Sequence, residues 1–225
     1  MFNPTNPPPL FTTLLLLTIT FPSALAINGN ATFYGGNLSG GNCMFSSYSL
    51  PSGVYGTAIA GPNWNSAAQC GACVRVTGPQ GNFIKAMIVD QCPGCAANHL
   101  DLFQNAFGQL APLQAGIIPI SWEVVPCGIS GPLTLRAKDG ASQWWFSLQA
   151  FNANHPITGL EVSTSGGNTW QSTARRDYNY FEKSSGGGFG TQAVAVRVSC
   201  ANGAKVTVQN VGVNGGIVTQ AGGNC

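Results

Sequence analysis

The sequence predicts a mainly β chain with two parts, and three observations support this fold class. Short apolar runs alternate with polar residues and are separated by glycine, proline, asparagine and serine, a pattern typical of half-buried strands. Six of the eight cysteines in the 225-residue chain precede Gly128, and the other two lie far downstream. Residues 127–132 concentrate turn-forming residues and precede a change of composition, which indicates a domain boundary.

Residues 1–26 are typical of a secretory signal peptide. The apolar run over residues 10–21 is too short to span a bilayer with ease, and Ala24 and Ala26 match the small-residue rule for cleavage. The leader contains no lysine or arginine, which is unusual for such a segment. We expect a secreted, extracellular chain that begins at Ile27.

Short segments with strand or helix character follow one another along both parts. In the first part we expect a short helix over residues 105–110 and strands over 31–34, 74–77, 83–89 and 118–124. In the second part we expect strands over 133–135, 144–151, 160–162, 193–198 and 205–209, with a hairpin turn at Asn202-Gly203. Short strands at this spacing, over about 80–100 residues, favour a β-sandwich. The tail, residues 212–225, is rich in glycine and asparagine.

The eight cysteines are expected to form disulfides, because they follow a signal peptide. Their distribution predicts three bridges in the first part and one near the C-terminus, where Cys225 would tie down the tail by pairing with Cys200. Two CxxC pairs also resemble a four-cysteine zinc site, but secretion favours disulfides, so no metal is expected. The candidates are Cys43, Cys70, Cys73, Cys92, Cys95, Cys127, Cys200 and Cys225.

The composition excludes several classes of partner. Charged residues are only 7% of the chain, against about 25% in typical proteins, and the net charge is +2. The sequence has no basic stripe, so nucleic acid is not an expected partner, and it has no second apolar run long enough to cross a membrane. Abundant glycine, asparagine, serine, threonine and glutamine, together with aromatic residues, favour a neutral, hydroxyl-rich ligand.

Residues 84–101 are the candidate site in the first part. An apolar strand is expected to stop at Asp90, a Cys-Pro-Gly-Cys turn follows, and Asp101 comes next, so two of only seven acidic residues lie here. A buried strand that stops at a carboxylate beside a cross-linked turn can hold an acid at the rim of a groove. The alternative is that both residues serve as turn or helix-cap residues.

Aromatic residues are concentrated in the second part, where their flat faces would suit the C–H faces of pyranose rings. The alternative is that they fill the sandwich core. Trp144 and Trp145 cannot both face outward from a regular strand, because neighbouring side chains point to opposite faces, unless the strand is bulged or has not yet begun. The set comprises Trp144, Trp145, Trp170, Tyr178, Tyr180 and Phe181.

Five segments, in order along the chain, resemble the expansin family. They are residues 29–35 (GNATFYG), 89–93 (VDQCP), 100–102 (LDL), 136–145 (RAKDGASQWW) and 177–181 (DYNYF). The resemblance implies a six-stranded double-psi β-barrel over residues 27–128. This barrel is shared with family 45 glycoside hydrolases, barwin-like proteins and RlpA-type lytic transglycosylases. It also implies an immunoglobulin-like β-sandwich over residues 129–211, similar to the family 63 carbohydrate-binding module, with the tail held by its cysteine.

The resemblance also implies roles for individual residues, and it implies no cofactor. Asp101 is similar to the acid on which wall loosening depends, and Asp90 and Thr32 resemble its neighbours. The expected sugar-binding platform consists of Trp144, Trp145, Tyr178 and, beside them, Lys138. The family places both tryptophan rings outward, and residues 140–142 before them can delay the strand. Where bacterial members tend to carry tyrosine and glutamate after the first acid, this chain has Cys92 and Gly94.

The expected function is non-hydrolytic loosening of wall polymers by a monomer. Inverting hydrolysis needs two carboxyl groups, and the first part offers only Asp90, Asp101 and Glu123, the last in a strand expected to point elsewhere. The expected partner is a cell-wall polysaccharide, namely cellulose or a related glucan, with xyloglucan, chitin and peptidoglycan left open. The alternatives are lytic transglycosylase-like or weak endoglucanase activity, and a pure carbohydrate-binding or defence module.

Overall fold

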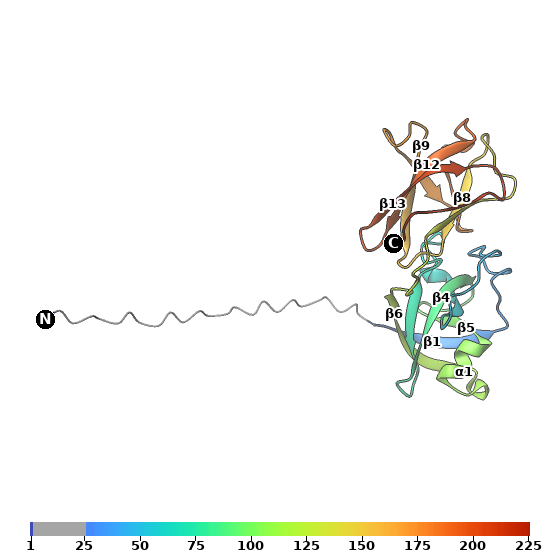
Figure 1. Ribbon diagram of the computed structural model, residues 1–225. Coiled ribbons are helices and arrows are strands. Elements are labelled where there is room, and N and C mark those ends of the chain that lie inside the picture. Colours follow the sequence, from blue (N-terminus) through green and yellow to red (C-terminus); the bar gives the residue numbers. More distant parts are fainter. Residues whose placement is uncertain (2–25) are drawn as a thin grey trace.

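The computed structural model describes Met1 and residues 26–225, so the predicted signal peptide lies, except for its two end residues, outside the described part. Two β bodies follow one another along the chain, and Figure 1 shows them stacked end to end. Within the described range, no helix combines the length and the apolar character needed to cross a bilayer.

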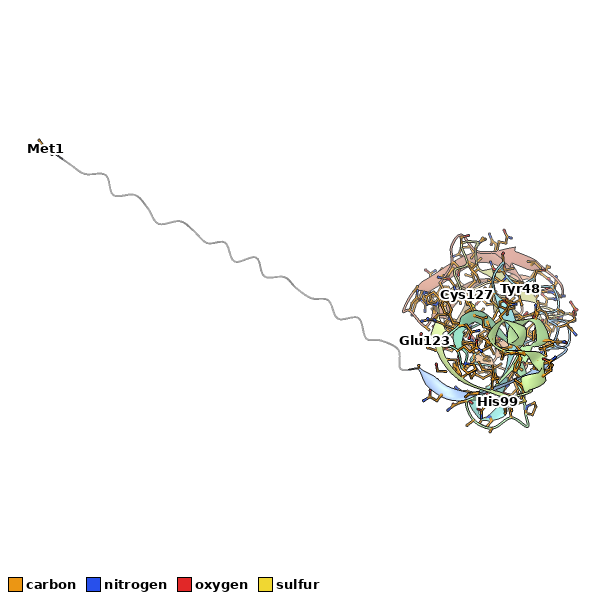
Figure 2. All side chains as sticks on the ribbon, turned by 90° about the horizontal axis from the view of Figure 1, so that it is seen from below. Met1, Tyr48, His99, Glu123 and Cys127 are labelled. Carbon is orange, nitrogen blue, oxygen red and sulfur yellow. A yellow bond between two sulfur atoms is a disulfide. The ribbon has the colours of Figure 1, made fainter. Side chains whose placement is uncertain are left out.

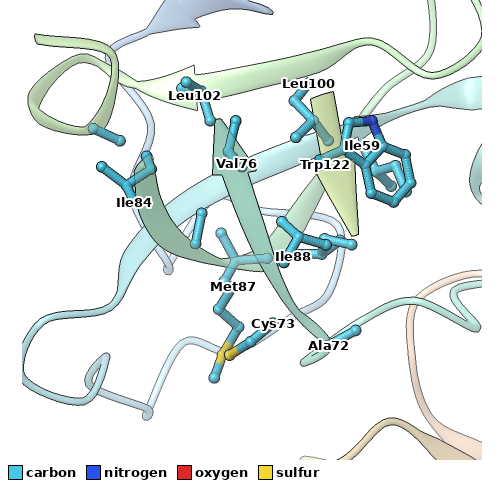
Figure 3. Close-up of a cluster of buried hydrophobic side chains, with 14 of the residues drawn as sticks. Ile59, Ala72, Cys73, Val76, Ile84, Met87, Ile88, Leu100, Leu102 and Trp122 are labelled. Carbon is cyan, nitrogen blue, oxygen red and sulfur yellow. The ribbon is translucent and has the colours of Figure 1, made fainter. Parts of the chain in front are cut away.

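The first body is a closed six-stranded barrel with strand order β1-β5-β2-β4-β3-β6. Its strands are β1 (Ile27–Tyr34), β2 (Tyr55–Ala60), β3 (Cys73–Thr77), β4 (Phe83–Cys92), β5 (Leu100–Phe103) and β6 (Ile118–Val125). The β1–β5 and β2–β4 pairs are parallel, and the other pairs are antiparallel. A short helix, α1 (Gln104–Leu110), follows β5, together with the single-turn helices η1 (Gly61–Asn63) and η2 (Leu113–Ala115). Apolar side chains from the strands fill the barrel interior (Figure 3).

Strand β4 is longer than the sequence pattern predicts. The expected end at Asp90 is wrong, because Gln91 and Cys92 continue the parallel ladder with Ile59 and Ala60 after a register shift that leaves one β4 residue, Val89, without a partner in β2. Asp90 therefore lies within a strand and not at the start of a loop. Strands β2 and β5 were not expected, since both are short and their apolar residues do not alternate over a long enough run.

The second body is an eight-stranded sheet with the order β13-β12-β9-β10-β11-β8-β7-β14. Its strands are β7 (Thr134–Ala137), β8 (Ser147–Phe151), β9 (Ile157–Ser163), β10 (Gln171–Arg175), β11 (Phe181–Lys183), β12 (Ala193–Cys200), β13 (Lys205–Gly212) and β14 (Val218–Gln220). These strands enclose a separate apolar core. The expected immunoglobulin-like connectivity stays a prediction. The tail is tied by the expected Cys200–Cys225 bridge, and it also contains a strand that was not expected, β14, which pairs with β7.

All eight cysteines are paired in disulfides, so none is left as a thiolate for the zinc alternative. Three bridges lie in the first body and one joins the C-terminus to the end of β12. The pairs are Cys43–Cys70, Cys73–Cys127, Cys92–Cys95 and Cys200–Cys225.

Removing the C-terminal bridge is expected to destabilise the protein measurably. It closes a loop with a sequence separation of 25, and the Cys200→Ser, Cys225→Ser variant should lose about 3 kcal/mol of unfolding free energy. The matched control is Cys92→Ser, Cys95→Ser, whose separation of 3 predicts a loss about half as large. Denaturant unfolding would measure both values, and an equal loss in the two variants would contradict the loop-length argument.

Buried polar side chains join the two bodies. The carbonyl oxygen of Cys43 in the first body accepts hydrogen bonds from Gln149 Nε2 at 2.9 Å and Asn179 Nδ2 at 3.1 Å, and both amide side chains are almost fully buried. Arg175 donates to the carbonyl oxygen of Ala67 at 2.8 Å. Buried polar groups without partners are costly, so these bonds favour one arrangement of the two bodies.

Candidate functional site

The two acids of the barrel lie in one row across neighbouring strands. Asp90 on β4 and Asp101 on β5 are both register partners of Ala58 on β2, and Thr32 on β1 is the partner of Asp101. Register partners point to the same side of a sheet, so only a methyl group stands between the two acids. Neighbouring strands are about 4.8 Å apart, which puts the two acidic Cα atoms about 10 Å apart.

Asp101 is held by one short hydrogen bond. Thr32 Oγ1 donates to Asp101 Oδ1 at 2.6 Å, and the same hydroxyl lies 2.9 Å from His99 Nε2. The threonine has one hydroxyl hydrogen, and it is donated to the carboxylate. Nε2 of the histidine must therefore carry a hydrogen and donate it to the Thr32 oxygen. Within the described residues, Oδ2 of the half-exposed Asp101 accepts no hydrogen bond, so it is available to a ligand.

Asp90 is in a different state, because both of its oxygens are occupied. Oδ1 accepts the backbone N–H groups of Asn42 at 2.7 Å and Gln91 at 2.8 Å, and Oδ2 accepts the Tyr34 hydroxyl at 3.1 Å. Burial, and then the neighbouring Asp90 carboxylate, raise the pKa of Tyr34 far above its ordinary value, so this phenol stays a donor. The arrangement suits an anchor for the segment around Asn42 better than a group that exchanges protons.

Two rings and a glycine flank the acidic row. Tyr34 and Phe103 pack edge to face, with ring centroids 5.6 Å apart. The Phe103 ring lies over Gly56, where an added Cβ would come within 2.4 Å of a ring carbon. A larger residue at Gly56 would therefore displace Phe103 from its place beside Tyr34.

His99 is a member of the site that the sequence reasoning missed. It is the residue just before β5, and its place beside the acidic row is shown by the hydrogen bond to Thr32, 67 positions away. Burial lowers the pKa of His99, and the nearby Asp101 carboxylate opposes this by raising it. The neutral ring is therefore favoured near neutral pH.

The opposing effect of Asp101 can be tested by NMR titration of the histidine rings. In Asp101→Asn the pKa of His99 is expected to fall further below its ordinary value, because the charge that raises it is gone. The ring of His155, in the second body, is the internal control. A His99 curve that stays in place in the variant would show that Asp101 does not act on this ring.

Glu123, the third acid of the barrel, is engaged elsewhere. Its carboxylate lies 3.8 Å from the guanidinium of Arg75 across the β3–β6 pair. Figure 2 shows Glu123 and His99 at separate places on the barrel. This position agrees with the expectation that Glu123 points away from the acidic row.

The two tryptophans lie on a turn that precedes β8. The Ser142 N–H donates to the Trp145 carbonyl oxygen at 2.9 Å, and the Trp145 N–H donates back to the Ser142 carbonyl oxygen at 3.1 Å. The expected strand over residues 144–151 begins instead at Ser147, so the pleat argument does not apply to the two rings. Trp144 is 72% exposed, whereas Trp145 is half-buried and packs against the core of the second body.

Tyr178 lies on a turn between β10 and β11. Asn179, the residue after it, has a positive φ of 61°, and the Asn179 N–H donates to the Arg176 carbonyl oxygen at 2.9 Å. Lys138 Nζ lies 6.0 Å from the centroid of the Tyr178 ring. The other aromatic residues are placed differently: Tyr180 and Phe181 are buried, and Trp170 lies half-exposed under the guanidinium of Arg197.

The turn that carries Tyr178 is also bound to the barrel. The carbonyl oxygen of Asp177 accepts hydrogen bonds from Trp64 Nε1 at 3.2 Å and from Asn42 Nδ2 at 3.4 Å. Asn42 is the residue whose backbone N–H binds Asp90. The acidic row and the aromatic turn are thus connected through one asparagine, a residue that no local sequence pattern distinguishes.

Comparisons with known proteins identify the family. A family model described as Lytic transglycolase matches residues 58–122. The chain is 33% identical over 200 residues to Expansin-YoaJ of Bacillus subtilis (strain 168), which covers 84% of this chain and 83% of that protein. The chain belongs to the expansin family. It is also 31% identical over 171 residues to Expansin-like protein 5 of Dictyostelium discoideum, which covers 72% of this chain and 71% of that protein.

Solved expansin structures agree with this assignment. The crystal structure of apo Clavibacter michiganensis expansin superposes with a TM-score of 0.77 at 31% identity, covering 89% of this chain and 98% of that one. A point variant of the same expansin, in complex with cellohexaose, gives a TM-score of 0.78 at 31% identity and the same coverage. The predicted resemblance to expansins and to their double-psi β-barrel is thereby confirmed.

Proposed function

We propose that this expansin is a secreted protein that binds cellulose or a related wall glucan and loosens the contacts between wall polymers without hydrolysing them. One observation carries the proposal: Asp101 is the acid with a free oxygen in the row, while both oxygens of Asp90 are occupied and Glu123 faces Arg75. Inverting hydrolysis needs a second carboxyl group that can activate water. The hydrogen bonds on Asp90 argue against that role for it.

The proposed mechanism uses binding energy to displace a glucan chain. Trp144, Trp145 and Tyr178, with Lys138 beside them, would contact the C–H faces of successive sugar rings. Asp101 would then hydrogen-bond or protonate a sugar oxygen further along the same chain, without completing bond cleavage. The complex of the Clavibacter variant with cellohexaose supports cellulose as the ligand class. Xyloglucan, chitin and peptidoglycan are the other polymers to compare.

The proposal includes the domain assignment. Residues 27–128 form the barrel domain, residues 129–211 the immunoglobulin-like carbohydrate-binding sandwich, and residues 212–225 the tail attached through Cys225. The separate apolar cores of the two bodies support this division. We further propose that the protein acts outside the cell as a monomer and without a cofactor.

A paired assay tests the proposal. Purified protein is applied to cellulose paper or wall strips, and mechanical weakening and sugar release are measured in the same tube. The expected result is weakening without a steady rise of soluble sugars. Steady accumulation of oligosaccharides at catalytic amounts of protein would contradict it.

Lytic transglycosylase-like cleavage is the second candidate function, because the matched family model bears that description and spans both acids of the row. A single acid can suffice when the substrate supplies its own nucleophile. This activity would produce anhydro-sugar ends from defined glycans, which mass spectrometry of the products would detect. Weak endoglucanase activity would produce new reducing ends instead.

A further inference from the structure

A nearly buried carboxylate lies beneath the aromatic turn of the second body, the turn between β10 and β11 that carries Tyr178. Glu182, on β11, is only 7% exposed and lies in register between Ser147 on β8 and Ala174 on β10. Its Oε1 accepts the hydroxyl groups of Tyr178 at 2.5 Å and Ser147 at 3.1 Å, and its Oε2 accepts Arg176 Nε at 2.8 Å. Both carboxylate oxygens are therefore hydrogen-bonded.

These donors keep the side chain ionised despite its burial. Burial by itself would raise the pKa of Glu182, but the hydrogen bonds from Tyr178, Arg176 and Ser147 outweigh it, and the pKa lies below its ordinary value. A buried carboxylate is costly unless it is paired and hydrogen-bonded. An apolar residue would fill the same space more simply, so the retained charge calls for a role other than packing.

The hydrogen bonds fix the aromatic turn at two points. Tyr178 and Arg176 belong to the same turn, and both donate to the one carboxylate. Burial, and then the hydrogen bond to Glu182, raise the pKa of Tyr178 to about 12, so its hydroxyl remains a donor under all ordinary conditions. With its hydroxyl end held, the ring has a set direction beside Lys138.

We propose that Glu182 is a positioning residue of the sugar-binding platform, which sets the Tyr178 ring in its binding orientation before a glucan chain arrives. The proposal rests on the proposed function, since it assigns a role within the same platform. A ring that is already ordered loses less conformational freedom on binding, and this improves affinity. Loss of one such hydrogen bond is expected to weaken cellulose binding roughly 3- to 10-fold.

Glu182→Gln is the first test. Glutamine keeps the size but replaces one oxygen by an NH₂ group, which would oppose the donor of Arg176 in one orientation and, in the other, would force the two hydroxyl groups to accept instead of donate. In both orientations the charge that strengthens these hydrogen bonds is lost. We expect cellulose affinity to fall roughly 3- to 10-fold. The matched control is Glu161→Gln, which removes the other tightly paired glutamate of the second body, 2.8 Å from Arg197 Nε, and should leave affinity unchanged.

A readout without polysaccharide separates positioning from the proposed function. NMR of ring-labelled tyrosine, assigned with Tyr178→Phe, should show a hydroxyl proton protected from exchange in the wild-type protein and an altered or lost signal in Glu182→Gln. If this signature is present but the wild-type protein binds no cellulose, the proposed function is wrong, while the hydrogen bond by which Glu182 orients Tyr178 is confirmed. An unprotected Tyr178 hydroxyl in the wild-type protein would overturn the proposal directly.

Tyr178→Phe completes the test, since it removes the hydroxyl group and keeps the ring. If Glu182 acts through that hydroxyl, Tyr178→Phe should bind about as weakly as Glu182→Gln, and the double variant should bind no more weakly than either. Additive losses, or wild-type affinity in Tyr178→Phe, would overturn the proposal. Because Tyr178→Phe changes no charge, it gives a result even if Glu182→Gln does not fold.

Discussion

Asp101→Asn is expected to reduce mechanical weakening of cellulose paper or wall strips at least about tenfold, while binding to cellulose stays within about twofold. Asparagine keeps the shape of the side chain and can still accept the Thr32 hydroxyl, which now bonds Asp101 at 2.6 Å. It cannot carry the charge or a transferable proton, and hydrogen bonds to a charged group are roughly twice as strong as neutral ones. Binding should be spared because the proposed sugar-binding platform lies in the other body.

The matched control is Glu123→Gln, which removes another acid from the same barrel. Glu123 faces Arg75 at 3.8 Å and is partly exposed, so its loss should leave both weakening and binding unchanged. Extension of wall strips under constant load measures the first quantity, and depletion of the protein by cellulose measures the second. Full weakening by Asp101→Asn would remove Asp101 from the mechanism and favour a pure carbohydrate-binding or defence module.

Comparing Asp101→Asn with Thr32→Val tests whether the residues of the acidic row act as a unit. Thr32 bridges His99 and Asp101 through one hydroxyl group, so Thr32→Val would break both contacts with little change of volume. If Thr32→Val weakens cellulose paper or wall strips less than the wild-type protein does, but more than Asp101→Asn does, the threonine takes part in the mechanism. The same loss in the double variant as in Asp101→Asn alone would show that Thr32 acts through the acid.

Two kinds of sequence signal predicted the candidate barrel site: the local pattern of residues 84–101 pointed to Asp90 and Asp101, and the resemblance to expansins added Thr32. Thr32 and Asp101 are 69 positions apart and meet because β1 and β5 pair in parallel, a contact that periodicity cannot predict. The local pattern predicted Asp101, but only the resemblance of five segments to expansins supplied Thr32. It did not supply His99, because that residue lies just before the matched segment and histidine alone carries no structural signal.

Sequence reasoning also left the roles of the two acids partly undefined. Asp90 was expected at the end of a strand, whereas β4 continues through it and its carboxylate binds the backbone of a distant segment at Asn42. The same asparagine reaches Asp177 in the second body. Such contacts depend on the arrangement of two bodies, each with its own core, and no single stretch of sequence encodes them.

Trp144→Ala is expected to weaken cellulose binding roughly tenfold without lowering stability. The ring is 72% exposed and lies on a turn before β8, so its removal leaves no cavity, while a stacked sugar ring would lose its contact face. Isothermal titration calorimetry, or depletion of the protein from solution by cellulose, would measure the affinity. Denaturant unfolding should give a free energy within about 0.5 kcal/mol of the wild-type value.

Trp145→Ala should behave differently, because this ring is half-buried against the core of the second body. We expect a similar loss of binding together with a loss of about 1–3 kcal/mol in unfolding free energy, since apolar contacts are removed. The contrast between the two neighbours is the informative result. If both variants bind cellulose as tightly as the wild-type protein, the platform lies elsewhere, and Tyr178 and Glu182 would have to be explained by stability alone.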